Sequence, residues 1–163
     1  MTCLFAPSLA QKILGFVRLI ILEIYKMEKI LLVAVLTLLA GCSTQPVNTE
    51  QASVVPPDRI WDKKATSKTP DTGVIIVKRD SGFIGSACLA SVYLDGNPIA
   101  DLSTREKVTL YAKPGRHILS ATPHGWCAGG MVEVGADVIL GKTLIYRIGY
   151  GANGDYRFSP TAF

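Results

Sequence analysis

The sequence has little of what enzymes and nucleic-acid-binding proteins usually need. It has only two histidines, no paired carboxylates of the kind used in acid–base catalysis, and no Gly-rich loop between a strand and a helix to hold phosphate. Four of its 17 Lys and Arg and two of its 13 Asp and Glu lie in residues 1–41, which leaves about +2 for residues 42–163. We therefore expect no enzyme, no bound metal and no nucleic-acid partner.

The N-terminal region also lacks an apolar run long enough to cross a membrane. The uncharged apolar segment from Ile30 to Ala40 has eleven residues, well short of the roughly 18–20 that a membrane-spanning helix needs. Lys29 precedes this segment, and the small residues Ala40 and Gly41 end it. A basic head, a short apolar run and small residues before a cut are typical of a secretory signal peptide.

The end of this segment, Leu39-Ala40-Gly41-Cys42, resembles the lipobox of bacterial lipoproteins. In that family the cysteine is diacylated, the peptide is cut before it, and the new N-terminus is acylated. The resemblance implies cleavage between Gly41 and Cys42 and a covalent lipid on Cys42, with no other cofactor. Ser43 implies export to the outer membrane, where an Asp would imply retention in the inner one. The alternative is an ordinary signal peptide, or a core helix, that happens to contain this cysteine.

The lipobox makes residues 1–41 a leader. We expect a helix there, with residues 27–41 as the signal peptide proper. Residues 1–26 carry a second, interrupted apolar segment that a signal peptide does not need. They indicate either a start placed too early, with Met27 as the true start, or an N-terminal extension that is discarded.

Residues 42–73 are predicted to form a flexible tether. Pro, Ser, Thr, Gln and Lys dominate this stretch, and such a composition offers few side chains that could anchor it to a core. Ile60 and Trp61 are the exceptions, and we expect them to dock on the edge of the domain. The compact domain is then predicted to cover residues 74–163.

Residues 74–163 show apolar alternation with a period of two, which favours β-strands, and no convincing helical periodicity. Strands are predicted over residues 74–77, 87–94, 98–102, 107–112, 116–122, 131–139 and 143–150. Asp95-Gly96 predicts a tight hairpin, and Pro114-Gly115 predicts a turn that pairs the strands on either side of it. We expect an all-β fold, a small antiparallel β-sandwich of about seven strands.

Two cysteines remain once the leader and the lipid site are set aside. Cys3 leaves with the leader and Cys42 carries lipid, so Cys88 and Cys127 form an even pair in an oxidising compartment. We expect a disulfide between them; the alternative is two buried, unpaired thiols.

The candidate binding surface consists of Phe83, His124 and Trp126, which lie in Gly-containing loops. A zinc site made from His124, Cys88 and Cys127 would lack a fourth ligand, and a Cys127–His124 nucleophile pair needs a geometry that a Gly-rich loop does not promise. Both hypotheses are weaker than the disulfide.

Other polar residues are predicted to have no part in a site. His117 is expected to pack at a turn and Asp95 to form one, and Arg79 and Asp80 are predicted to be solvated charges.

Three segments, residues 92–99, 114–120 and 141–146, also show a family resemblance. They are similar to PEGA-type surface β domains and to the DUF2846-type domain of bacterial lipoproteins, which carry a V-x-V-D-G hairpin, a P-G-x-H turn and a later Lys-Thr-aromatic strand. The resemblance implies a β fold and brings no catalytic residues.

The expected function is that of a lipid-anchored lipoprotein at the outer membrane, facing the periplasm. Its membrane contact is expected through the lipid, and its β-sandwich is expected to have a structural role or to bind an envelope protein. The alternative is a periplasmic module that binds a small ligand or a glycan.

Overall fold

The computed structural model divides the chain into two compact units, Met1–Gly41 and Cys42–Phe163. The structure describes residues 18, 22–27, 29–31, 44–127 and 129–162. All described residues of the first unit are helical, in agreement with the helix predicted there. None of the helical stretches in the described ranges is long and apolar enough to cross a membrane.

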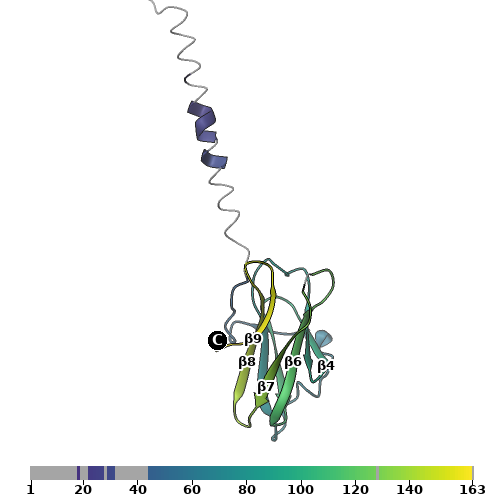
Figure 1. Ribbon diagram of the computed structural model, residues 1–163. Helices are drawn as coiled ribbons and strands as arrows, with labels where there is room; N and C mark the ends of the chain where they lie inside the picture. The colour runs from purple at the N-terminus through teal and green to yellow at the C-terminus, as the bar shows by residue number, and fades with distance from the viewer. Residues whose placement is uncertain (1–17, 19–21, 28, 32–43, 128, 163) are drawn as a thin grey trace, which may run out of the picture. The chain divides into compact units, whose positions relative to one another are not determined.

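The second unit is an all-β sandwich, as predicted (Figure 1). Its described part has nine strands where about seven were predicted. These are β1 (Ser53–Val54), β2 (Gly73–Arg79), β3 (Ala90–Leu94), β4 (Asn97–Leu102), β5 (Glu106–Ala112), β6 (Gly115–Pro123), β7 (Val132–Val138), β8 (Thr143–Tyr150) and β9 (Tyr156–Pro160), with a short 3-10 helix, η1 (Pro57–Arg59). One sheet has the order β1-β5-β2-β8-β9 and the other has the order β4-β3-β6-β7.

The first sheet is mixed, whereas the sequence analysis expected antiparallel pairing throughout. β2 pairs with β8, and β1 with β5, in parallel; the other pairings are antiparallel. The predicted pairing across Pro114-Gly115 is wrong, because β5 pairs with β2 while β6 pairs with β3 and β7. Turn residues predict a reversal of the chain, but they do not determine which sheet the returning strand joins.

The hairpin predicted at Asp95-Gly96 is confirmed, and it joins β3 to β4. The two residues have φ values of 49° and 77°. A tight hairpin turn needs positive φ at both central positions, and Asp and Gly are among the residues that adopt it most readily.

Residues 44–61 contact the sandwich along much of their length, so the predicted tether over residues 42–73 is wrong for this part of it; residues 67–71 are exposed. Val47, Ala52 and Val55 are at most 4% exposed. Main-chain hydrogen bonds add to this burial, because β1 runs beside β5. Composition alone missed these contacts, since hydrogen bonding to a sheet edge does not need apolar side chains.

The predicted docking of Ile60 and Trp61 is confirmed. Ile60 forms a β-bridge with Ala100, and the Trp61 indole Nε1 donates a hydrogen bond to Asp101 Oδ2 at 3.2 Å. The segment therefore reaches both sheets of the sandwich.

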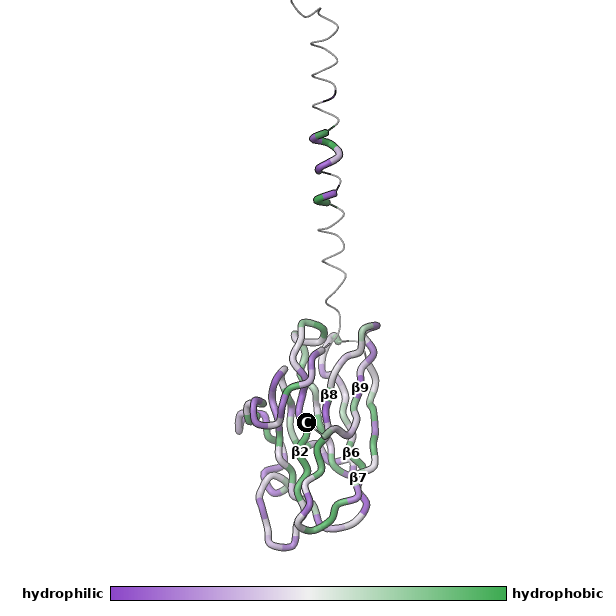
Figure 2. Tube along the Cα trace, turned by 90° about the vertical axis from the view of Figure 1, so that its left-hand side faces the viewer, coloured by the Kyte–Doolittle hydropathy of each residue, from purple (hydrophilic) through white to green (hydrophobic). Residues whose placement is uncertain are grey.

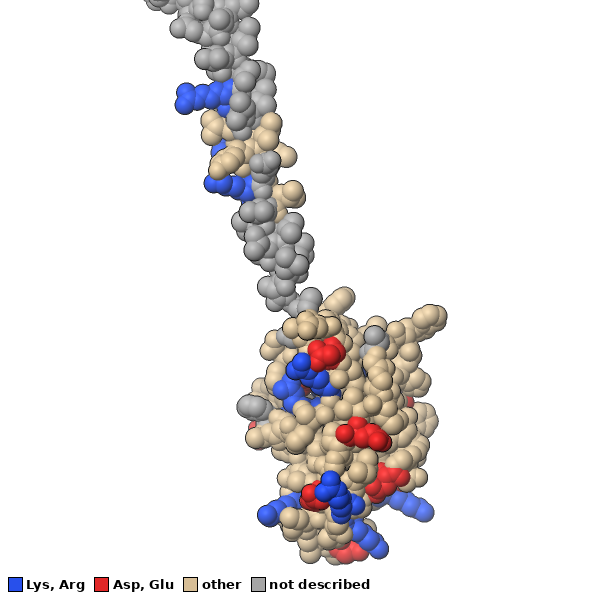
Figure 3. Space-filling model, in the orientation of Figure 1, with Lys and Arg blue, Asp and Glu red and all other residues tan. Residues whose placement is uncertain are grey.

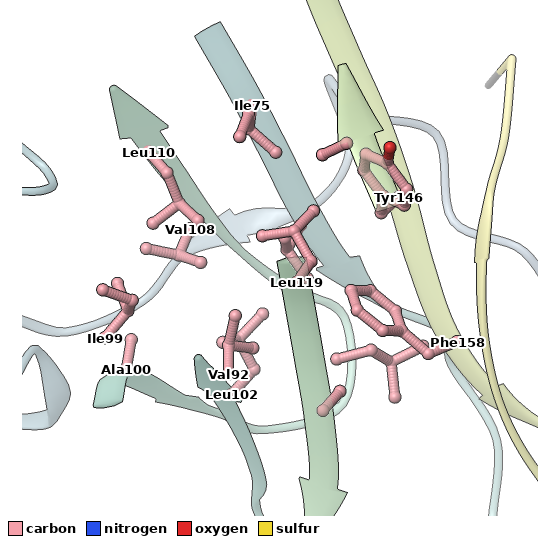
Figure 4. Close-up of a cluster of buried hydrophobic side chains, with 14 of the residues drawn as sticks. Ile75, Val92, Ile99, Ala100, Leu102, Val108, Leu110, Leu119, Tyr146 and Phe158 are labelled. Atoms are coloured by element: carbon pink, nitrogen blue, oxygen red, sulfur yellow. The ribbon is translucent and has the colours of Figure 1, made fainter. Parts of the chain in front are cut away.

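The core lies between the two sheets and follows the predicted alternation. Figure 4 shows Ile75, Val108 and Leu110 of one sheet opposite Val92 and Leu119 of the other, all of them buried. Along the strands the apolar stretches appear as green segments in Figure 2. Burial of this apolar surface is the main source of stability for a domain of this size.

Candidate functional site

Three loops and the start of the second unit meet at one end of the sandwich. β2 and β8 run in the same direction, so the loops after them leave from the same end. The last residue of β6 pairs with the first of β3, which brings the β6–β7 loop there too. We call this the loop end: the described residues of 80–89, 124–131 and 151–155, with Thr44 and Gln45. The β8–β9 loop is at the top of the domain in Figure 1.

The predicted disulfide between Cys88 and Cys127 is confirmed. It joins the loop after β2 to the loop after β6, with the two Cα atoms 6.1 Å apart. Next to it, the His124 N–H donates to the Leu89 carbonyl at 2.8 Å. These contacts hold the two loops together, and they remove Cys127 as a free nucleophile or metal ligand.

Arg79 is buried at the loop end, so its prediction as a solvated charge is wrong. Its guanidinium donates to the carbonyls of Cys88 at 2.5 Å, Leu102 at 2.9 Å and Gly85 at 2.5 Å. Burial lowers the pKa of this side chain. The planar fork of Arg suits such divergent acceptors, and here it fastens the loop after β2 to the end of β4.

Asp80 is also buried, again contrary to the prediction. Its Oδ2 accepts hydrogen bonds from Arg147 Nε at 3.1 Å, from Arg147 Nη2, and from Thr44 Oγ1 at 3.4 Å. Its Oδ1 has no partner within the described part of the chain. Desolvation raises the pKa of the carboxyl, against the opposing effect of Arg147.

Lys78 completes a row of three buried charged residues. Its Nζ donates to the Val47 carbonyl at 2.6 Å and to Thr49 Oγ1 at 3.4 Å, and burial lowers its pKa. The strand alternation was a usable signal, because it places Arg79 on the same face as the inward-pointing Val77.

A tight contact at Gly85 positions the loop after β2. Gly85 has a φ of 72°, and a Cβ there would lie 2.2 Å from Tyr150 Cε2. Tyr150 packs edge-on against Tyr156 with ring centroids 5.3 Å apart, and burial raises the pKa of both phenols. Any other residue at position 85 would displace the loop.

A hollow of about 260 Å³ opens beside Thr44 at this end. Arg147, Arg157, Tyr150 and Ser159 are among its lining residues, and Figure 3 shows basic side chains grouped around it. Arg147 pairs with Asp80, and Arg157 pairs with a carboxylate of the β8–β9 loop. Because both arginines already have carboxylate partners, the hollow carries little net charge.

The three residues predicted as a binding surface all lie at the loop end. Phe83 is 89% exposed and Trp126 is 103% exposed. The His124 side chain is also exposed, with Nδ1 3.9 Å from Asp101 Oδ2. The two aromatic side chains project from the surface and do not line an enclosed pocket.

His117 and Asp95 lie at the opposite end and have the predicted structural role. His117 Nδ1 is 2.6 Å from Asp95 Oδ2, and Nε2 is 2.8 Å from the Lys113 carbonyl. The Ile118 N–H donates to Asp95 Oδ1 at 2.9 Å. These contacts tie the β3–β4 turn to the start of β6.

The predicted cleavage and lipidation site, Gly41 and Cys42, lies outside the described residues. In the ranges that the structure describes, no group of three or more His, Cys, Asp or Glu residues is placed to hold a metal ion. Comparison with models of known protein families, with curated proteins and with solved structures finds no match for this chain.

Proposed function

We propose that this chain is a bacterial lipoprotein, held at the outer membrane by lipid on Cys42 and facing the periplasm. Its β-sandwich would have a structural or protein-interaction role and no catalytic one. The observation that carries the proposal is the motif Leu39-Ala40-Gly41-Cys42 after a basic residue and a short apolar run.

The division of the chain supports this proposal. The boundary between the two compact units falls between Gly41 and Cys42, at the bond that the motif predicts to be cut. Thr44 is the first described residue of the second unit, and its N–H and hydroxyl both bond to the Tyr150 carbonyl at 3.1 Å. Cleavage there would release the whole sandwich without removing any of its described parts.

The contacts of Cys127 and of the two histidines support a non-catalytic role. Cys127 is held in a disulfide. His117 has both ring nitrogens engaged in a turn, and His124 faces Asp101 at 3.9 Å, beyond hydrogen-bonding distance. These contacts supply no activated nucleophile.

The proposal is tested by substituting the cysteine at the proposed lipidation site. Cys42→Ser is compared with Cys3→Ser in the full chain, expressed in a bacterial host with an outer membrane. We expect Cys3→Ser to yield a cleaved, acylated protein in the envelope fraction, and Cys42→Ser to yield an uncut precursor without fatty acid. Intact mass and metabolic labelling with a fatty acid measure both properties.

A trimmed Cys42→Ser product of normal mass in the envelope would overturn the proposal. The membrane assignment has its own test, because Ser43→Asp is expected to move the protein from the outer to the inner membrane on a density gradient. An unchanged distribution would leave the lipid anchor standing but contradict the sorting role of Ser43.

A second candidate is a periplasmic module that binds a small ligand or a glycan. The exposed Phe83 and Trp126 on linked loops favour it, because aromatic faces stack on apolar ligand surfaces. Binding of soluble envelope glycans to the purified protein, lost in Trp126→Ala, would support this candidate.

A further inference from the structure

We infer that the loop end docks on the membrane that holds the anchor, with Phe83 and Trp126 entering the interface between the lipid headgroups and the acyl chains. This inference rests on the proposed lipid on Cys42. It goes beyond it, because an anchor alone leaves open how the domain is oriented.

The first step is the short distance between the anchor and the folded domain. Thr44 is fixed at the loop end by its hydrogen bonds to the Tyr150 carbonyl. Cys42 precedes it by two residues, which span at most about 7 Å of extended chain. Because Thr44 itself is fixed, the residues after it cannot act as a spacer, so the lipid holds the loop end against the bilayer.

The second step is the position of Phe83 beside that attachment point. Gln45 and Ser81 exchange two main-chain hydrogen bonds, at 2.7 Å and 3.0 Å. A Cβ on Gly82 would lie 3.0 Å from Thr44 Cα. The residue next along the chain is Phe83, so its ring leaves the domain close to the point where the lipid is attached.

The third step is that these aromatic side chains are exposed on loops that are held in place. Arg79 bonds to the carbonyls of Gly85 and Cys88, and the disulfide holds the loop that carries Trp126. Holding large apolar side chains in water is unfavourable. Trp is enriched where membranes meet water, because its ring is apolar and its N–H is polar.

The charges at this end indicate which force drives docking. Arg147 pairs with Asp80, and Arg157 pairs with Asp155. In each pair the carboxylate offsets the charge of the arginine, so the loop end has little excess positive charge to attract anionic lipids. Docking should therefore depend on apolar insertion and change little with salt.

The opposite end supplies a matched control. Ile139 and Leu140, in the β7–β8 turn, are 50% and 56% exposed. β8 starts at this end and finishes at the loop end. If apolar exposure alone caused membrane contact, this turn would insert as readily as Trp126, but the anchor holds it away from the bilayer.

The experiment uses the acylated protein purified from membranes and reconstituted in phosphatidylethanolamine and phosphatidylglycerol vesicles. The chain has two tryptophans, so Trp61→Phe leaves Trp126 as the only one. We expect its emission to shift to the blue and to be quenched several-fold more strongly by lipids brominated near the headgroup than by soluble acrylamide. The control carries Trp61→Phe, Trp126→Phe and Leu140→Trp, and its emission should respond to acrylamide alone.

Flotation of the vesicles separates this inference from the proposed function. Protein that does not float with the vesicles would contradict the anchor itself. Protein that floats, with Trp126 as open to acrylamide as the Leu140→Trp control, would overturn only the docking. Phe83→Asp should reduce the quenching of Trp126 by brominated lipid, whereas Leu140→Asp should not. Protection of Trp126 by soluble glycans without lipid quenching would also overturn docking, in favour of glycan binding.

Discussion

Single charged residues decide how this sandwich is held together at its loop end. Arg79 is buried and bonds to three main-chain carbonyls, and Asp80 beside it bonds to Arg147 and Thr44. A buried charge is costly unless hydrogen bonds compensate it. Two adjacent charged residues at the end of an apolar strand can therefore be interpreted in two ways. They are either exposed to solvent or buried by another segment of the chain.

At the opposite end, His117 provides a pH-dependent contact. Both of its ring nitrogens face acceptors, Asp95 Oδ2 and the Lys113 carbonyl, so the doubly protonated ring fits best. Desolvation opposes protonation, but these two bonds prevail and raise the pKa of His117 above its usual 6.5. Desolvation likewise opposes ionisation of Asp95, yet the bonds from His117 and the Ile118 N–H lower its pKa below 3.8.

We predict that raising the pH from about 5.5 to about 8 lowers the free energy of unfolding by at most about 1 kcal/mol, because the pair is partly exposed. The contribution of His117 is fully present below its unfolded pKa and is lost as the pH rises through its folded pKa. Denaturant unfolding at several pH values measures this. His117→Gln should remove the slope and His124→Gln should keep it; equal slopes in both variants would contradict the assignment.

At the scale of elements, the parts that sequence patterns predicted are those set by local chemistry. Alternation placed Val108 and Leu110 on the buried face of β5, and the Asp95-Gly96 turn formed its hairpin. The parts that they missed depend on distant partners. Pro114-Gly115 carries the chain into the other sheet, and no local pattern around those residues records that β5 pairs with β2.

The candidate site likewise has parts that the sequence predicted and parts that it missed. Counting cysteines and inferring the compartment predicted the Cys88–Cys127 disulfide, and the aromatic loop residues Phe83 and Trp126 were named as a surface. The buried network around Arg79 was missed, because its acceptors are main-chain carbonyls, which a side-chain pattern does not record. The partners of Asp80, Thr44 and Arg147, come from distant parts of the chain. The lipid on Cys42 stays a prediction.

The disulfide should contribute measurably to stability. Cys88 and Cys127 are 39 residues apart, and closing a loop of that length adds about 2–4 kcal/mol to the free energy of unfolding. We predict this loss for the double variant Cys88→Ala, Cys127→Ala in chemical denaturation. The reduced native protein should lose a similar amount, and an unchanged midpoint in both samples would show that the loops are held by their other contacts.

At the scale of the whole molecule, residues 44–61 belong to the folded domain. Val55 is buried in the core cluster, and its N–H donates to the Lys107 carbonyl at 2.9 Å. Arg59 donates to the Asp101 carbonyl at 3.0 Å and pairs with Glu106 at 2.5 Å. The tether was predicted from the proline-rich composition, and composition describes side chains but does not describe main-chain hydrogen bonds.

Limited proteolysis tests this packing with two adjacent residues. Val55 is 2% exposed and Val54 is 71% exposed. We predict that trypsin leaves the bond after Arg59 intact in the native protein and in Val54→Asp, and cuts it in Val55→Asp, because a buried unpaired carboxylate releases the segment. Mass spectrometry identifies the cut. Rapid cleavage after Arg59 in the native protein would contradict this packing and support the flexible tether predicted from the sequence.

The parallel pairing of β2 with β8 has a consequence for how the protein is made. It joins residues 69 positions apart, such as Val74 and Thr143, so the middle of the larger sheet cannot close until nearly all of the chain has arrived. Contacts so distant in sequence slow folding. A chain exported N-terminus first would keep one edge of β2 open until the last strands are delivered, and that interval is when it is most exposed to misassociation.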